Sequence, residues 1–136
     1  MPIDHIKSFI FCLQEALRKN KNVKDGTIVY RGIKEIKLEN NIGIGSKFYF
    51  REFISTSIDE KVGRDFIRDE GTLFKIKIKN NKRRNYCFYV GKISAFPNES
   101  EILISSFCYY VVTEIKRIEG GIDLVNLDCL GFLLDE

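Results

Sequence analysis

The second half of the chain is a series of short β-branched and aromatic segments that are separated by turn signals. Residues 72–79 alternate strictly between apolar and polar positions, and Leu73 or Phe74, Ile76 and Ile78 are predicted to face inward. Further strand candidates follow at residues 86–90, 101–104, 107–118 and 122–134, with Gly120-Gly121 marking a hairpin between the last two. A run of strands without alternating helices favours a mainly antiparallel arrangement and disfavours a doubly wound parallel fold.

Two helices are predicted in the first half of the chain. Apolar residues at helical spacing predict an amphipathic helix over residues 4–19, which Asp4 caps. Residues 27–30 are predicted to form a buried strand and residues 47–57 one or two strands, after which Asp59 caps a short helix that Gly71 ends. We therefore predict an α+β fold with an N-terminal helix and a mainly antiparallel core that is arranged as two sheets.

The size and composition of the chain fit one globular domain over residues 1–136. Hydrophobic residues make up 44% of the 136 residues, which is enough for a single core. The 22 basic and 19 acidic residues leave a net charge of +3, which is too small to predict a nucleic acid or a membrane as partner. The first residues lack the pattern of a signal peptide, and no apolar stretch is long enough to span a membrane. We therefore predict a soluble monomer.

The four cysteines are predicted to be free thiols. Cys12, Cys87, Cys108 and Cys129 include no C-x-x-C pair, and the single histidine, His5, cannot complete a zinc site with them, so no metal is predicted. Three of them have apolar or aromatic neighbours, which suits reduced cysteines that pack as small hydrophobes. The alternative is one or two disulfides, which would indicate a secreted protein.

Three short motifs contain residue types that serve in catalysis or ligand binding. They are Arg31 within Tyr30-Arg31-Gly32, the run Ser55-Thr56-Ser57, and Glu99-Ser100-Glu101, and each stands at the end or the start of a predicted strand. Each motif alone has an ordinary interpretation as a surface ion pair, a turn or cap, or a pair of solvated acids. Because residues two apart on a strand point to the same face, Glu99 and Glu101 can face one pocket.

Taken together, the order and surroundings of these motifs resemble the catalytic core of the arginine-specific ADP-ribosyltransferases, over residues 7–118. Residues 27–32 resemble the first active-site strand of that family, residues 53–57 with the following helix the second, and residues 89–104 the third. The resemblance implies an ADP-ribosyltransferase-like fold and a toxin-like enzyme, which we expect in the cytoplasm or as a secreted or delivered effector. It also implies that NAD is the substrate, that nicotinamide is released, and that ADP-ribose passes to a protein side chain, arginine.

The resemblance also implies a role for each carboxylate. Glu101 would hydrogen-bond the 2′-hydroxyl of the nicotinamide ribose and stabilise the oxocarbenium-like charge that develops when the bond to nicotinamide breaks. Glu99 would hold the incoming guanidinium and help to remove its proton. The second carboxylate is therefore the mark of an arginine acceptor.

The remaining site residues would hold NAD. Arg31 would bind the pyrophosphate through its planar fork of donors, and the backbone of Gly32 would approach the nicotinamide amide. Ser55 would orient Glu101 and support the nicotinamide ribose, while Thr56 and Ser57 finish the strand and start the next turn. Phe96 would either pack on the acceptor or close the turn before Glu99.

Other signals are weaker. The segment Gly43-Ile44-Gly45 does not extend to a dinucleotide-binding G-x-G-x-x-G motif. The basic residues between Lys75 and Arg84 indicate a solvated face or a docking patch for an acidic partner. Phe53 and Phe66 are candidates for an aromatic contact to NAD. Two other functions stay open, an NAD glycohydrolase and a catalytically silent domain that binds NAD or a protein.

Overall fold

The computed structural model describes residues 23–34, 42–67, 70–81, 85–89 and 101–133. The helix predicted over residues 4–19, together with Cys12, Phe96 and Glu99, lies outside these described residues. The elements are β1 (Ile28–Lys34), β2 (Lys47–Tyr49), β3 (Ile54–Ser57), α2 (Glu60–Asp65), β4 (Glu70–Ile78), β5 (Cys87–Tyr89), β6 (Glu101–Ile104), β7 (Cys108–Glu119) and β8 (Gly121–Phe132). The strand candidates of the sequence are thus confirmed, with residues 47–57 divided into two strands.

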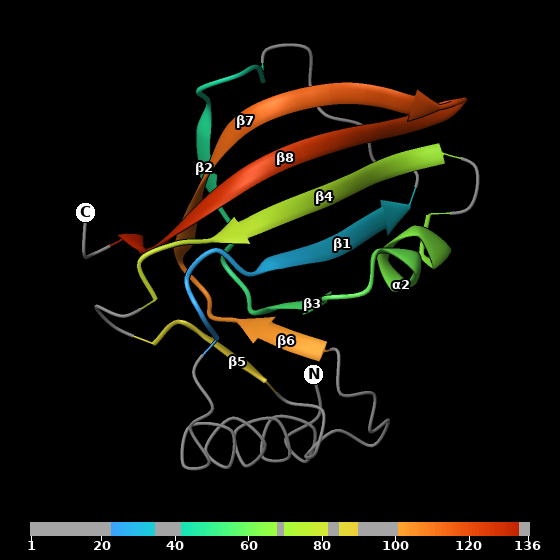
Figure 1. Ribbon diagram of the computed structural model, residues 1–136. Helices are drawn as coiled ribbons and strands as arrows, with labels where there is room; N and C mark the ends of the chain where they lie inside the picture. The colour runs from blue at the N-terminus through green and yellow to red at the C-terminus, as the bar shows by residue number, and fades with distance from the viewer. Residues whose placement is uncertain (1–22, 35–41, 68–69, 82–84, 90–100, 134–136) are drawn as a thin grey trace.

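All the described strands belong to one mixed sheet with the order β2-β7-β8-β4-β1-β3-β6-β5 (Figure 1). The mainly antiparallel arrangement is confirmed, because the β4–β8 pair is the only parallel one among the described strands. The predicted division into two sheets is not confirmed. We call β2-β7-β8-β4-β1 the five-stranded part of the sheet and β3-β6-β5 the three-stranded part.

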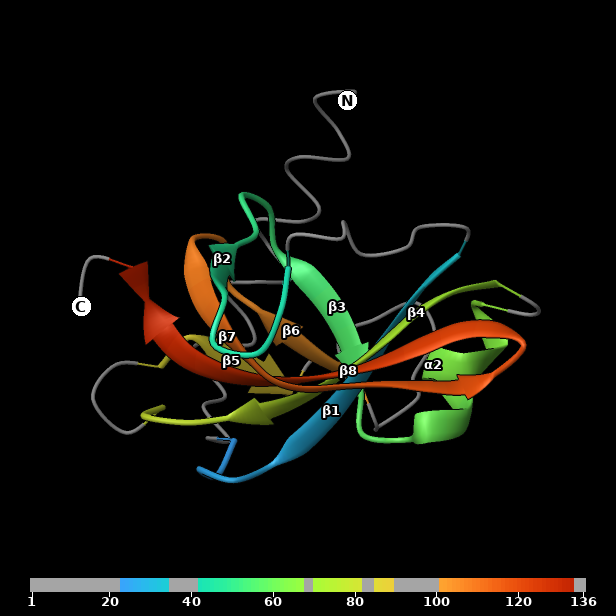
Figure 2. The same cartoon turned by 90° about the horizontal axis from the view of Figure 1, so that it is seen from above.

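The two parts meet at a narrow seam between β1 and β3. These strands share only the residue pair Tyr30 and Ser57, whereas β1 and β4 share seven pairs and β3 and β6 share four. In the view of Figure 2, β3 ends at β1 and the two strands diverge from there, in agreement with their single pair of residues. The sheet is therefore continuous in its hydrogen bonding, but it bends at this seam.

Helix α2 follows β3 directly and is capped as the sequence predicts. The side chain of Asp59 accepts a hydrogen bond from the backbone N–H of Lys61 at 3.0 Å, which satisfies one of the unpaired donors of the first turn. Glu60 and Arg64 form an ion pair at 2.9 Å, one helical turn apart. Gly71 does not end the helix as predicted, because α2 already ends at Asp65 and Gly71 lies within β4.

The core is divided between the two faces of β4. Phe74, Ile76 and Ile78 belong to the main hydrophobic cluster, whereas Leu73 packs in a smaller cluster with Ile67 and Ile122. Because neighbouring residues of a strand point to opposite faces, Leu73 and Phe74 are both buried, on different sides. The sequence could not choose between these two residues because both faces of this strand are covered.

Three cysteines lie in the main cluster. Cys87, Cys108 and Cys129 are buried and form no disulfide among the described residues, in agreement with the prediction that they pack as small hydrophobes. Burial raises the pKa of the Cys87 thiol, so that side chain stays protonated. Within the same described residues, no helix has the length and apolar character needed to cross a membrane.

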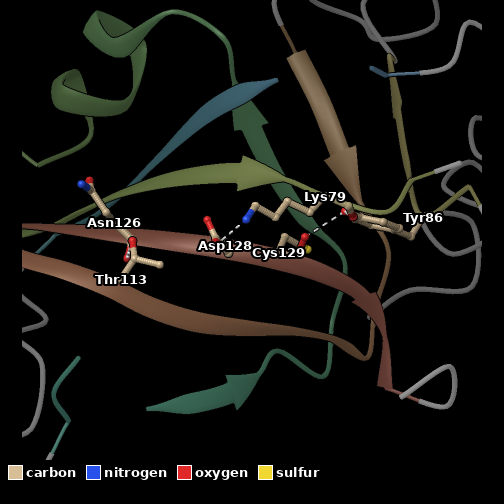
Figure 3. A network of polar contacts seen from close by, with 6 residues as sticks. All are labelled: Lys79, Tyr86, Thr113, Asn126, Asp128 and Cys129. Carbon is tan, nitrogen blue, oxygen red and sulfur yellow. Dashed lines mark hydrogen bonds and ion pairs between the residues drawn. The ribbon is translucent and has the colours of Figure 1, made fainter. Parts of the chain in front are cut away.

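Polar contacts join the ends of β4 and β8 beside this cluster (Figure 3). The Tyr86 hydroxyl lies within hydrogen-bond reach of the Lys79 carbonyl and donates to the Cys129 carbonyl at 3.0 Å. Lys79 forms an ion pair with Asp128 at 3.1 Å. The parallel pairing of β4 with β8 is therefore supported by side chains near the C-terminal end of β4.

Candidate active site

The sheet brings the three sequence motifs together at the seam. Arg31 lies in β1, Ser55 in β3 and Glu101 at the first position of β6. These three strands are neighbours in the order β1-β3-β6, although Arg31 and Glu101 are far apart in the sequence. Within β3 and β6, Ser57 is directly opposite Glu101, and Ser55 is opposite Leu103.

A chain of hydrogen bonds runs from Arg31 to Glu101. The Arg31 Nη1 donates to the backbone carbonyl of Ser55 at 3.0 Å, and the Ser55 Oγ donates to the Glu101 Oε2 at 2.6 Å. The second bond is short, as expected for a hydroxyl that donates to a carboxylate. Ser55 is exposed and the other two side chains are partly exposed, so a ligand can reach all three.

The other two residues of the Ser-Thr-Ser run hold the local backbone, as predicted. The Thr56 Oγ1 is buried and donates to the Ile102 carbonyl at 2.7 Å, which ties β3 to β6 next to Glu101. The Ser57 Oγ accepts from the backbone N–H of Asp59 at 3.0 Å, which forms the turn into α2. Their contacts fix the strand and the turn on which Ser55 depends.

Gly32 is required by a contact that the sequence did not reveal. A Cβ added to Gly32 would lie 2.0 Å from the carbonyl oxygen of Gly63 and 2.8 Å from the Ile67 Cγ1, so no other residue fits without moving α2. The side of Gly32 that lacks a side chain therefore faces helix α2. Arg31, the neighbouring residue on the same strand, points to the opposite face. The approach of the Gly32 backbone to nicotinamide stays a prediction.

Tyr30 and Gly63 complete the contact between β1 and α2. The Tyr30 side chain is partly buried and is hydrogen-bonded to Glu60, and burial followed by the charge of Glu60 raises the pKa of its hydroxyl. Tyr30 therefore acts as a donor at neutral pH. Gly63 is buried in the middle of α2. A glycine inside a predicted helix was the only sign in the sequence that this position packs closely against another element.

The remaining sequence candidates divide into three cases. Glu99 and Phe96 lie outside the described residues, so their positions stay predictions. Phe53 is partly buried before β3, and Phe66 at the C-cap of α2 is 65% exposed, which leaves it accessible to a ligand or partner. In the basic stretch, Lys79 is paired with Asp128 and Lys77 is exposed across from the same residue, whereas residues 82–84 lie outside the described residues, so the solvated face and the docking patch both stay predictions.

The described parts of the chain contain no group of three or more histidine, cysteine or acidic residues that could hold a metal ion. The polar groups gathered at the seam are instead a guanidinium, a hydroxyl and a carboxylate. Such a set can bind an anionic ligand through the guanidinium and stabilise a positive charge through the carboxylate.

Two solved ADP-ribosyltransferases have folds similar to that of this chain. The Vis toxin of Vibrio splendidus has a TM-score of 0.70 at 21% identity, with 91% of this chain and 56% of that chain covered. The toxin Plx2a of Paenibacillus larvae has a TM-score of 0.62 at 25% identity, with 86% of this chain and 67% of that chain covered. The predicted ADP-ribosyltransferase-like fold is thereby confirmed.

The family is shown by the sequence itself. The model of the NAD:arginine ADP-ribosyltransferase family matches residues 1–131, and the chain belongs to this family. Rat ecto-ADP-ribosyltransferase 5 is 29% identical over 104 residues, which are 75% of this chain and 30% of the relative. The NAD(+)-arginine ADP-ribosyltransferase EFV of Enterococcus faecalis is 29% identical over 119 residues, 84% of this chain and 23% of the relative. The chain thus spans less than a third of the length of these curated relatives.

Proposed function

We propose that this chain cleaves NAD and transfers its ADP-ribose to an arginine side chain of a protein, releasing nicotinamide. The observation that carries the proposal is the hydrogen-bonded chain from Arg31 through Ser55 to Glu101, in a member of the NAD:arginine ADP-ribosyltransferase family. Each of these three hydrogen-bonded residues supplies a group that the reaction needs.

Glu101 is proposed to stabilise the transition state of NAD cleavage. The ribose becomes positively charged as its bond to nicotinamide breaks, and a nearby carboxylate lowers the energy of that state. The Glu101 Oε2 accepts the hydrogen bond from Ser55 at 2.6 Å, and the Oε1 can accept one from the ribose 2′-hydroxyl. Ser55 therefore orients the carboxylate.

Arg31 is proposed to bind the pyrophosphate of NAD. A guanidinium has five N–H donors, and the bond to the Ser55 carbonyl uses one at Nη1. The donors that remain suit the bidentate recognition of phosphate oxygens. Arg31 would thus contact NAD and the β3 backbone together.

Glu99 is proposed to bind the acceptor guanidinium. It precedes Glu101 by two residues, the spacing at which two side chains of an extended segment share a face. The Vis toxin has been solved in complex with agmatine, which is a small guanidine compound. We therefore choose agmatine as the acceptor for a first assay.

An NAD glycohydrolase is the second candidate function. Hydrolysis needs the group that stabilises the oxocarbenium-like charge and does not need a carboxylate for the acceptor. Arg31, Ser55 and Glu101 would suffice for that reaction, with water in the place of the guanidine.

The test is to incubate the chain with NAD and to measure nicotinamide release and agmatine labelling in parallel. Both products are expected for the transferase, and nicotinamide without labelled agmatine would favour the glycohydrolase. Binding of NAD with neither product would contradict the proposal and favour the silent domain. Labelling of a cell lysate, followed by mass spectrometry, would then identify the protein acceptor and the modified residue.

We further propose that residues 1–136 act as one domain and as a monomer, in the cytoplasm or as a secreted or delivered effector. The continuous sheet and its main hydrophobic cluster support the single domain. Light scattering coupled to size-exclusion chromatography tests the oligomeric state.

A further inference from the structure

We infer that Gly63 is a positioning residue for the active site, because it sets how closely helix α2, and with it β3, lies against β1. The inference rests on the proposed function, since it concerns the alignment of Arg31 with Ser55 and Glu101. The atoms nearest to a Cβ added at Gly63 belong to Tyr30 and Leu73, and none of them belongs to these three side chains.

The sheet alone aligns β1 and β3 weakly. Tyr30 and Ser57 are their only paired residues among those described, and the Arg31 bond to the Ser55 carbonyl is partly exposed to water. Since each exposed hydrogen bond stabilises a structure only modestly, a second contact is needed to fix the spacing of the two strands.

Helix α2 supplies this contact. It is joined to β3 by the short turn in which Asp59 donates to Ser57, so α2 and β3 move together. On its inner face, the Gly63 carbonyl lies so close to Gly32 that a Cβ there would be 2.0 Å from the oxygen. The two glycines let the helix lie directly on the strand that carries Arg31.

The contact is tight from the side of the helix as well. A Cβ added to Gly63 would lie 3.0 Å from the Tyr30 Cβ and 3.0 Å from the Leu73 Cδ1. The Leu73 methyl can move by rotation, but the Tyr30 Cβ is fixed to the backbone of β1. A methyl group at position 63 therefore displaces α2 from β1 by a few tenths of an ångström, and β3 follows.

The test compares Gly63→Ala with Gly43→Ala, a matched control because a Cβ at Gly43 meets nothing within 4 Å. We expect Gly63→Ala to lower kcat for nicotinamide release by about tenfold, since small displacements of reacting groups are costly. Its melting temperature should change little, because alanine is the better helix former and offsets part of the strain. Gly43→Ala should leave kcat unchanged.

Two further measurements separate positioning from a merely structural role. The amide resonances of Ser55 and Glu101 should shift in Gly63→Ala and not in Gly43→Ala. Adding Leu73→Val should not recover the lost kcat, because the fixed Tyr30 Cβ, and not the movable Leu73 methyl, displaces the helix. A lower melting temperature with unchanged kcat and unchanged resonances would overturn the inference.

If Gly63→Ala does not fold, Tyr30→Phe tests whether the packing of α2 on β1 controls the site, since it keeps the Tyr30 Cβ and removes only the hydrogen bond of the hydroxyl to Glu60. A smaller loss in kcat with shifted Ser55 and Glu101 amides is expected, and no change in either would contradict the inference. A wild-type chain that releases no nicotinamide would refute the proposed function instead. The amide shifts would still decide the role of Gly63.

Discussion

The two parts of the sheet differ in how they are held together and in what they carry. In the five-stranded part, β7 and β8 are 12 residues long, and Ile76 in β4 and Leu127 in β8 are almost completely buried. In the three-stranded part, β3, β5 and β6 are only three or four residues long. Ser55 and Glu101 belong to this second part. The difference indicates that the long strands stabilise the fold, while the short strands present the reactive groups.

Side-chain hydrogen bonds supplement the backbone pairing of the short strands. Thr56 donates to the Ile102 carbonyl, Ser55 to Glu101, and Arg31 crosses the seam to the Ser55 carbonyl. Changes in the five-stranded part should therefore affect stability first, and changes at the seam should affect activity first.

The largest effect is expected for Ile76→Ala in the five-stranded part. Ile76 has no exposed surface, and its truncation should lower the free energy of unfolding by about 2–5 kcal/mol. Urea denaturation measures this loss, and kcat per folded molecule should stay unchanged at a temperature where the variant is folded. Ile44→Ala is the matched control, because Ile44 is 74% exposed and its truncation should change stability by less than about 0.5 kcal/mol. A parallel fall in kcat for Ile76→Ala would show that the two parts are not separable.

Glu101→Gln should give the opposite result. It removes the charge that stabilises the oxocarbenium-like state, so nicotinamide release and agmatine labelling should both fall by at least about 100-fold. The melting temperature should stay near that of the wild type, since the side chain is partly exposed. Glu52→Gln, at an exposed position before β3, is the control that should retain activity. Loss of stability in proportion to rate would mean that Glu101 supports the fold and not the reaction.

Glu99→Gln separates transfer from NAD cleavage. The charge of Glu101 remains, so agmatine labelling should be lost while nicotinamide release to water stays measurable. Both products are followed in the same samples. Equal losses in the two assays would assign Glu99 to the pocket itself, and the arginine acceptor would lose its main support.

Much of the fold could be predicted because its local signals agree. Residues 101–104 are a strand as predicted, Gly120 lies in the turn between β7 and β8, and Asp59 caps α2. The division into two sheets could not be settled in this way. The number of sheets depends on whether β1 and β3 pair across the seam. They do so through the single pair of Tyr30 and Ser57, which joins the two parts into one sheet.

The site shows the same limit. The order of the motifs predicted that Arg31, Ser55 and Glu101 belong together, and the structure joins them by hydrogen bonds. The contact of Gly32 with Gly63 was not predicted, because it requires two segments 31 positions apart to pack at backbone distance. Periodicity and motif spacing report which face a residue occupies, but not which backbone it touches on the far side.

Arg31→Lys tests the seam itself, with the smallest expected effect. Lysine keeps the positive charge but offers a single ammonium, which cannot bind the Ser55 carbonyl and form a bidentate contact to phosphate with a planar fork. We expect NAD to bind about tenfold more weakly, the equivalent of roughly 1.4 kcal/mol, by calorimetry. Arg51→Lys, at an exposed position, is the control that should bind NAD as the wild type does. Unchanged affinity with a lower kcat would mean that Arg31 acts by holding β3 against β1 through the Ser55 carbonyl. In that case the pyrophosphate contact must come from another residue, and the role of the five-stranded part would be to align the site rather than to bind NAD.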